Sequence, residues 1–140
     1  MQAIDLDQLI PGAKHFRWKE MLRCNQWGIH AFPTDIQYLN ILKLIKAAEE
    51  VRHYLDEPMY VTSGLRPPLY NKMIGGVRMS AHKIGMAMDF ACKKIKADRI
   101  RELLEPVLDD FNIRMEKNKG SNWVHIDIRE PGNSGRYFNP

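Results

Sequence analysis

The chain has 140 residues, of which 44% are hydrophobic and 27% charged. This composition excludes an intrinsically disordered protein, and the length favours one ordinary domain with its own hydrophobic core. The formal net charge of +4 suits an anionic partner such as nucleic acid or bacterial cell wall, although ordinary scatter of surface charge explains it equally well. The sequence has no run of about 18 apolar residues, so we expect no membrane insertion.

Residues 1–33 predict an irregular segment with one short helix near 18–25. They start without a basic stretch and lack a continuous apolar one, so we predict no secretory signal and synthesis in the cytoplasm. The two cysteines, Cys24 and Cys92, are too few for a disulfide framework and lack the paired spacing of a structural zinc site. We therefore expect them to be buried free thiols.

A long helix is predicted from Asp35 to Asp56. Thr34 can cap this helix, and Gln37 follows three residues later, which is the spacing of a capping box. Apolar residues near helical spacing predict one face that is turned toward the core. These residues are Leu39, Leu42, Ile45, Ala48 and Leu55.

Two strands are predicted after this helix. The first covers residues 59–62 and ends in a loop at 63–68, where serine, glycine and two prolines interrupt it. Gly75 and Gly76 mark another turn, and residues 87–91 predict a short buried strand.

A second helix is predicted over residues 97–111, because its apolar residues form one stripe. They are Ile100, Leu103, Leu104, Val107, Leu108 and Phe111. Pro106 lies inside this pattern, so we expect a kink or an early end there. Residues 113–116 and 123–128 alternate as a hairpin does. The whole predicts a single α+β domain over residues 1–140, with a small, mostly antiparallel sheet and helices packed on one of its faces.

The segment from Ser80 to Asp89 carries the strongest chemical signal. His82 and Asp89 can converge only if the chain turns between them, and Gly85 permits that turn. Asp89 lies in an apolar strand, where a carboxylate is costly unless it is paired or bound to a metal. His125 in a neighbouring strand would complete two histidines and a carboxylate, the set found in catalytic zinc sites. On spacing alone, hydrogen-bonded core residues are the more common explanation of such a pattern.

The same segment resembles the zinc D-Ala-D-Ala carboxypeptidase family, whose members include carboxypeptidases, D,D-dipeptidases and phage endolysins. All five fixed positions of its S-x-H-x-x-G-x-A-x-D signature match, at Ser80, His82, Gly85, Ala87 and Asp89. Residues 62–68 resemble its T-S-G-x-R-S-P stretch, Asn71 with residues 75–76 its N-x-x-x-G-G, and residues 123–125 its W-x-H. The resemblance implies the fold that this family shares with the hedgehog signalling domain.

The resemblance also implies roles for particular residues. One zinc ion per chain would be held by His82, Asp89 and His125. Arg66 would lie near the substrate, where its guanidinium stabilises an oxyanion or holds a carboxylate; the alternative is a solvated loop arginine. Ser80 would hydrogen-bond the substrate or simply tie its own loop.

The general base departs from the family pattern. Many relatives carry Asp or Glu three residues before the last histidine, but this chain has Asn122, which cannot take a proton at neutral pH. Alternation in the hairpin places Glu116 on the same face as His125, so Glu116 is the preferred base, the alternative being an exposed strand residue. Asp127 is the second candidate, or else it orients a ligand histidine.

The function implied by the resemblance is zinc-dependent hydrolysis of peptide bonds in peptidoglycan stem or crosslink peptides, of carboxypeptidase or endopeptidase type. The protein would act on the bacterial cell wall, as a phage or prophage lytic enzyme or as a released enzyme, with no nucleic-acid partner. The sequence predicts neither its oligomeric state nor the bond that is cut. Asn122 keeps open an alternative, a zinc-containing binding module of the same fold with weak or no catalysis.

Overall fold

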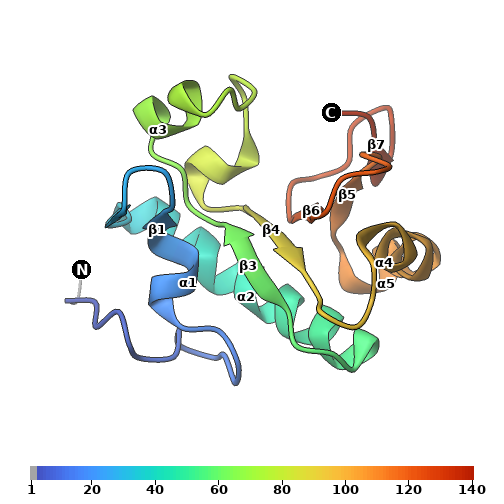
Figure 1. Ribbon diagram of the computed structural model, residues 1–140, viewed down its shortest axis with the longest axis horizontal. Helices are drawn as coiled ribbons and strands as arrows, with labels where there is room; N and C mark the ends of the chain where they lie inside the picture. Colours follow the sequence, from blue (N-terminus) through green and yellow to red (C-terminus); the bar gives the residue numbers. More distant parts are fainter. Residues whose placement is uncertain (1–2) are drawn as a thin grey trace.

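A five-stranded sheet forms the centre of the computed structural model, which describes residues 3–140 (Figure 1). In order across the sheet, the strands are β3 (Tyr60–Ser63), β4 (Ala87–Ala91), β6 (Val124–Asp127), β5 (Arg114–Glu116) and β7 (Tyr137–Phe138). Neighbouring strands from β3 to β5 are antiparallel, and β7 is parallel to β5. The predicted α+β class with a mostly antiparallel sheet is confirmed, and one parallel edge strand is added.

Helix α2 (Asp35–Leu55) runs behind β3 and β4 and covers one face of the sheet (Figure 1). It begins at the predicted capping box: the Gln37 amide donates to Thr34 Oγ1, and the Thr34 amide donates to Gln37 Oε1. The predicted apolar face is partly wrong, because Leu39 is 57% exposed. The buried face follows the i, i+3, i+4, i+7 pattern that starts at Ile41, which points Leu39 toward solvent.

The helical region predicted over residues 97–111 is interrupted at Pro106, as the sequence indicates. Helix α4 (Ala97–Leu104) ends at a 3-10 turn, Glu105–Val107, which contains Pro106, and α5 (Leu108–Phe111) follows. Proline has no amide hydrogen and its ring clashes with the preceding turn, so a continuous α-helix cannot pass through it. The predicted early end is therefore confirmed.

Several short elements were not predicted from the sequence. They are the hairpin of β1 (Arg23–Cys24) and β2 (Ile29–His30), helix α3 (Pro68–Met73), the 3-10 turn η1 (Ala81–Ile84) and strand β7. Helix α1 (Trp18–Leu22) is shorter than predicted because the chain then enters β1. Both cysteines are free; Cys24 is buried as expected, whereas Cys92 is only half-buried.

Alternation along the strands separates the core from the opposite face of the sheet. The core receives Met88, Phe90, Met115, Val124 and Ile126. The side chains between them, which point away from α2, are Asp89, Arg114, Glu116, His125 and Asp127. Within residues 3–140, no helix is both long enough and apolar enough to span a membrane. The sheet thus presents a row of charged and histidine side chains on the face away from α2.

Candidate metal centre

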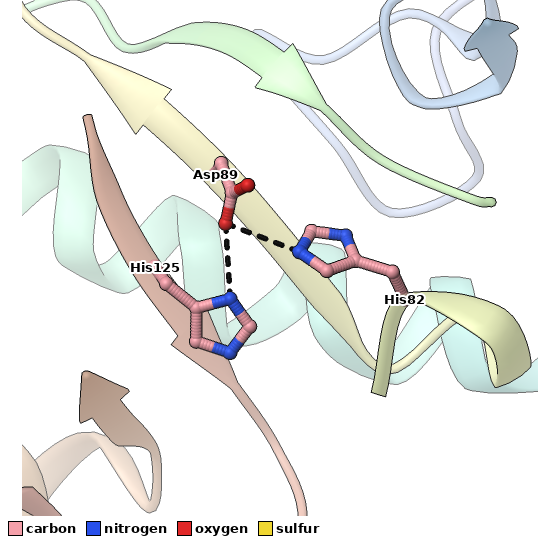
Figure 2. A group of neighbouring side chains, drawn as sticks. All are labelled: His82, Asp89 and His125. Atoms are coloured by element: carbon pink, nitrogen blue, oxygen red, sulfur yellow. Dashed lines mark hydrogen bonds and ion pairs between the residues drawn. The ribbon is translucent and has the colours of Figure 1, made fainter. Parts of the chain in front are cut away.

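Three buried side chains from separate elements converge on this face of the sheet: His82 from η1, Asp89 from β4 and His125 from β6 (Figure 2). Asp89 Oδ1 lies 3.1 Å from His82 Nε2 and 2.9 Å from His125 Nδ1. The potential ligand atoms of all three residues lie within 4.8 Å of one another. The structure therefore brings together the three residues that the sequence predicts as metal ligands.

Backbone geometry explains how the three meet. Asp89 and His125 are directly opposite in the β4–β6 register, where side chains on one face are close neighbours. The turn between His82 and Asp89 depends on Gly85, whose φ of +79° is in the left-handed region. A Cβ on Gly85 would also lie 2.8 Å from the carbonyl oxygen of Gln37, so only glycine lets the turn pack against α2.

The His82 ring is held by a hydrogen bond on its outer side. Its Nδ1 lies 2.8 Å from the carbonyl oxygen of Gly64, which can only accept, so Nδ1 carries the hydrogen and the Nε2 lone pair points to Asp89. Gly64 itself packs against the backbone of Met21, where a Cβ would collide. Burial lowers the pKa of His82 and so favours the neutral ring that a metal requires.

The His125 ring is held in a similar way by a carboxylate. Its Nε2 donates to Asp127 Oδ2 at 2.9 Å, which directs Nδ1 toward Asp89. Burial alone would lower the pKa of His125, but the hydrogen bonds to Asp127 and Asp89 prevail and raise it to about 9. Burial alone would raise the pKa of the Asp89 carboxyl, but the two histidines prevail and hold it well below its usual range.

Arg66 forms an ion pair with the other oxygen of the Asp89 carboxylate. Its Nη2 donates to Asp89 Oδ2 at 3.0 Å, its Nε donates to Ser63 Oγ at 2.9 Å, and its Nη1 lies 3.4 Å from Asn71 Oδ1. This ion pair leaves Asp89 Oδ1 directed at the two histidines. The sequence predicts Arg66 near the site, but it does not predict this contact with a candidate ligand.

The donor set fits a zinc ion. Two imidazole nitrogens and one carboxylate oxygen are the protein ligands of many catalytic zinc sites, which keep a further position for water. In each histidine, the ring nitrogen that faces away from Asp89 is hydrogen-bonded to a carbonyl or carboxylate oxygen, as in most zinc-binding histidines.

A sequence model of the family described as peptidase M15 matches residues 14–127, a span that includes all three residues of the cluster. The chain belongs to the peptidase M15 family. This confirms the resemblance found in the S-x-H-x-x-G-x-A-x-D segment and makes the chain a member of a family of zinc metallopeptidases. No curated protein matches the sequence significantly.

A cleft opens above the centre of this M15 protein. Its walls include Arg66, Val77, Ser80, Glu116, Trp123 and Pro140. Glu116 is half-buried, and its Oε1 lies 3.8 Å from His125 Nδ1, so the predicted base does point into the site. Asn122, at the position where many relatives carry a carboxylate, is exposed to solvent.

Ser80 and Asp127 each form a hydrogen bond with a histidine of the cluster. Ser80 is buried, and its Oγ accepts the amide hydrogen of His82 at the start of η1. Asp127 is completely buried and accepts two hydrogen bonds from Arg114, besides the one from His125. Both residues therefore hold a histidine of the M15 cluster.

The sequence does not predict the contacts by which three polar residues support the cluster. Gln37 and Asn40 of α2 donate to the carbonyl oxygens of Lys83 and Ile84, in the turn that follows His82. Asn71 is buried and donates to the carbonyl oxygen of Val77 in the cleft wall. A detectable signal existed for Asn40, a polar residue at a core position of an amphipathic helix, since such a residue needs a hydrogen-bond partner.

Proposed function

We propose that this protein is a zinc peptidase that hydrolyses peptide bonds in stem or crosslink peptides of bacterial peptidoglycan. One zinc ion per chain is held by His82, Asp89 and His125. The observation that carries the proposal is the convergence of three buried ligand atoms whose histidines are each fixed from behind. A single domain over residues 1–140 carries the whole site, and the protein acts at the cell wall as a phage or prophage lytic enzyme.

Glu116 is proposed as the general base. When zinc is bound, it supplies Lewis acidity and a water of lowered pKa. The Glu116 carboxylate lines the cleft beside His125, so it can take the proton of the attacking water and later return it to the leaving amine. Asn122 has no group that titrates, so the base must come from another position than in many relatives.

Arg66 is proposed to serve both the metal ligand and the substrate. Its bond to Asp89 Oδ2 orients the carboxylate, while its remaining N–H groups line the cleft. There they can donate to the oxyanion that develops as the peptide carbonyl is attacked, or hold a substrate carboxylate. Ser80 Oγ accepts from His82 and keeps its own hydrogen, so it can tie the loop and still donate to the substrate.

Asp127 is proposed as an orienting residue and not as the base. Its carboxylate has no exposed surface, and both of its oxygens accept hydrogen bonds from Arg114 while Oδ2 also accepts from His125. A base must reach the water whose proton it removes. Asp127 lies behind His125 with respect to Asp89, so it is poorly placed for that role.

The decisive experiment is digestion of purified, crosslinked peptidoglycan by the zinc-loaded protein, followed by mass analysis of the released peptides. We expect zinc-dependent cleavage that a chelator abolishes. Loss of a single terminal D-Ala identifies a carboxypeptidase, and separation of crosslinked peptides identifies an endopeptidase. No cleavage by zinc-loaded protein, together with retained binding to peptidoglycan, would overturn the proposal in favour of a binding module.

A further inference from the structure

We infer that Arg114 and Phe138 are positioning residues of the metal centre, which act on His125 through Asp127. The inference rests on the proposed zinc site and extends it to strand β7. Phe138 lies outside the span 14–127 that the family model matches. The contact chain runs from the Phe138 ring to the Arg114 guanidinium, then to the Asp127 carboxylate and to the His125 ring.

The link between Arg114 and Asp127 is a two-point ion pair. The residues are directly opposite in the β5–β6 register. Arg114 Nε donates to Oδ1 at 2.7 Å and Nη2 donates to Oδ2 at 3.0 Å. Two parallel hydrogen bonds from one planar group fix the plane of a carboxylate. The Arg129 backbone amide donates a further hydrogen bond to Oδ1 at 3.1 Å. The Asp127 side chain is fully buried, so without Arg114 it would be a buried anion that has lost its counterion.

The aromatic ring of Phe138 packs against the Arg114 guanidinium. The centre of its ring lies 4.1 Å from Arg114 Cζ, a close cation–π contact. Backbone hydrogen bonds from Met115 to Arg136 and from Lys117 to Phe138, both 2.7 Å, hold β7 against β5. The same ring lies edge-on to His125, with 6.1 Å between the ring centres. Phe138 thus packs against both Arg114 and His125.

Positioning matters because an imidazole ring can rotate about its bond to Cβ. The bond from Nε2 to Asp127 Oδ2 is the contact that directs Nδ1 toward Asp89 and the metal position. If the carboxylate plane turns, Nδ1 turns with it. Removal of such an outer partner commonly weakens metal affinity by about 10–100-fold.

The direction in which zinc affinity changes when Arg114 is removed distinguishes a positioning role from a purely electrostatic one. If Arg114 acted only through its positive charge, its removal would strengthen zinc binding, because like charges repel. If Arg114 positions His125, its removal weakens zinc binding. Arg114→Met keeps much of the side-chain volume while removing the charge and both hydrogen bonds, so it tests the two against each other.

The experiment compares zinc dissociation constants, measured by chelator competition from the zinc-loaded protein, together with the visible absorption spectra of the cobalt-substituted forms. We expect about 10–100-fold weaker zinc binding and an altered cobalt spectrum in Arg114→Met, with smaller losses in Arg114→Lys and Phe138→Leu. The matched controls are Lys117→Met and Tyr137→Leu. Lys117, which directly follows β5, and Tyr137 of β7 form a second cation–π pair, at 5.3 Å, and their variants should bind zinc as the wild type does.

Arg114→Lys and Phe138→Leu keep the test open if Arg114→Met does not fold. Wild-type zinc affinity and cobalt spectra in both of these variants would overturn the inference and leave the proposed function standing. Tighter zinc binding in Arg114→Met would overturn it as well. Failure of the wild type to bind zinc would instead remove the proposed function.

Discussion

Asp89 and His125 lie directly opposite each other on β4 and β6, with Asp89 Oδ1 2.9 Å from His125 Nδ1. Their approach is therefore set by the backbone register of two neighbouring strands. Slippage by a single residue would turn one of the two side chains into the core. The hydrophobic residues on the other face, which oppose such a slip, thus also protect the geometry of the candidate centre.

The first prediction concerns the metal ligands. His82→Ala and His125→Ala should each lose stoichiometric zinc, because three protein ligands are the minimum seen in catalytic zinc sites. Metal analysis of protein prepared without chelator measures the zinc content. His53→Ala, at an exposed position on α2, is the control and should keep one zinc per chain. If both ligand variants bind zinc as tightly as the wild type, the ligand assignment is wrong.

The second prediction concerns the proton acceptor. Glu116→Gln keeps the shape of the side chain and removes its titrating group, so kcat should fall by about 10²–10⁴-fold with zinc retained. Asp127→Asn should mainly weaken zinc binding. Full activity in Glu116→Gln, with a collapse in Asp127→Asn at full zinc occupancy, would reverse the two roles. Raised activity in Asn122→Glu would show that the position used by many relatives still works in this fold.

The third prediction concerns Arg66. At saturating zinc, Arg66→Ala should lower kcat by about 10²-fold or more, the scale for losing a transition-state donor. Because Arg66 also holds Asp89 Oδ2, we expect roughly tenfold weaker zinc binding as well. Steady-state kinetics and chelator competition measure the two effects separately. Turnover like that of the wild type would remove Arg66 from the catalytic machinery.

The fourth prediction concerns Gly76, which packs against Arg66 and Asn71. A Cβ at Gly76 would collide with Asn71 Oδ1 and lie 3.1 Å from Arg66 Nη1. Gly76→Ala should therefore displace the guanidinium and lower turnover, by up to about 10²-fold for a shift near 1 Å. Gly132→Ala is the matched control, since a Cβ there meets no atom within 4 Å. Equal kinetics in the two variants would show that this packing does not position Arg66.

The fifth prediction concerns stability as a function of pH. The pKa of His125 is raised to about 9 in the metal-free fold, against about 6.5 in an unfolded chain. Its stabilising contribution is therefore complete below pH 6.5 and is lost as the pH rises toward 9. The pKa of His82 is lowered, so that residue costs stability only on the acidic side. Zinc requires the neutral ring, so its affinity should rise over the same interval.

Urea unfolding of metal-free and zinc-loaded protein between pH 6.5 and 9 measures this effect. The free energy of unfolding should fall with rising pH in the metal-free form, and the stabilisation by zinc should grow. The metal-free variant His125→Gln lacks the titrating ring and should show a flatter profile. Parallel pH profiles for the metal-free and zinc-loaded forms would contradict the prediction.

Local periodicity predicts the parts of the fold and of the site that depend on residues close together in the sequence. Alternation in the hairpin correctly places Glu116 beside His125, and Pro106 correctly divides the second helical region. Strand β7 has only two residues, too few to show a period. The ion pairs of Arg66 with Asp89 and of Arg114 with Asp127 depend on how distant segments meet, which no local pattern records.

Pro140 lines the cleft, and the C-terminal end lies far from the N-terminal segment (Figure 1). Residues joined after Pro140 would thus emerge at the mouth of the candidate centre. A polyhistidine purification tag at that end would offer competing imidazoles to the same ion and distort every affinity measured. For metal titrations and cobalt spectra, an affinity handle belongs at the N-terminal end or should be removed by proteolysis.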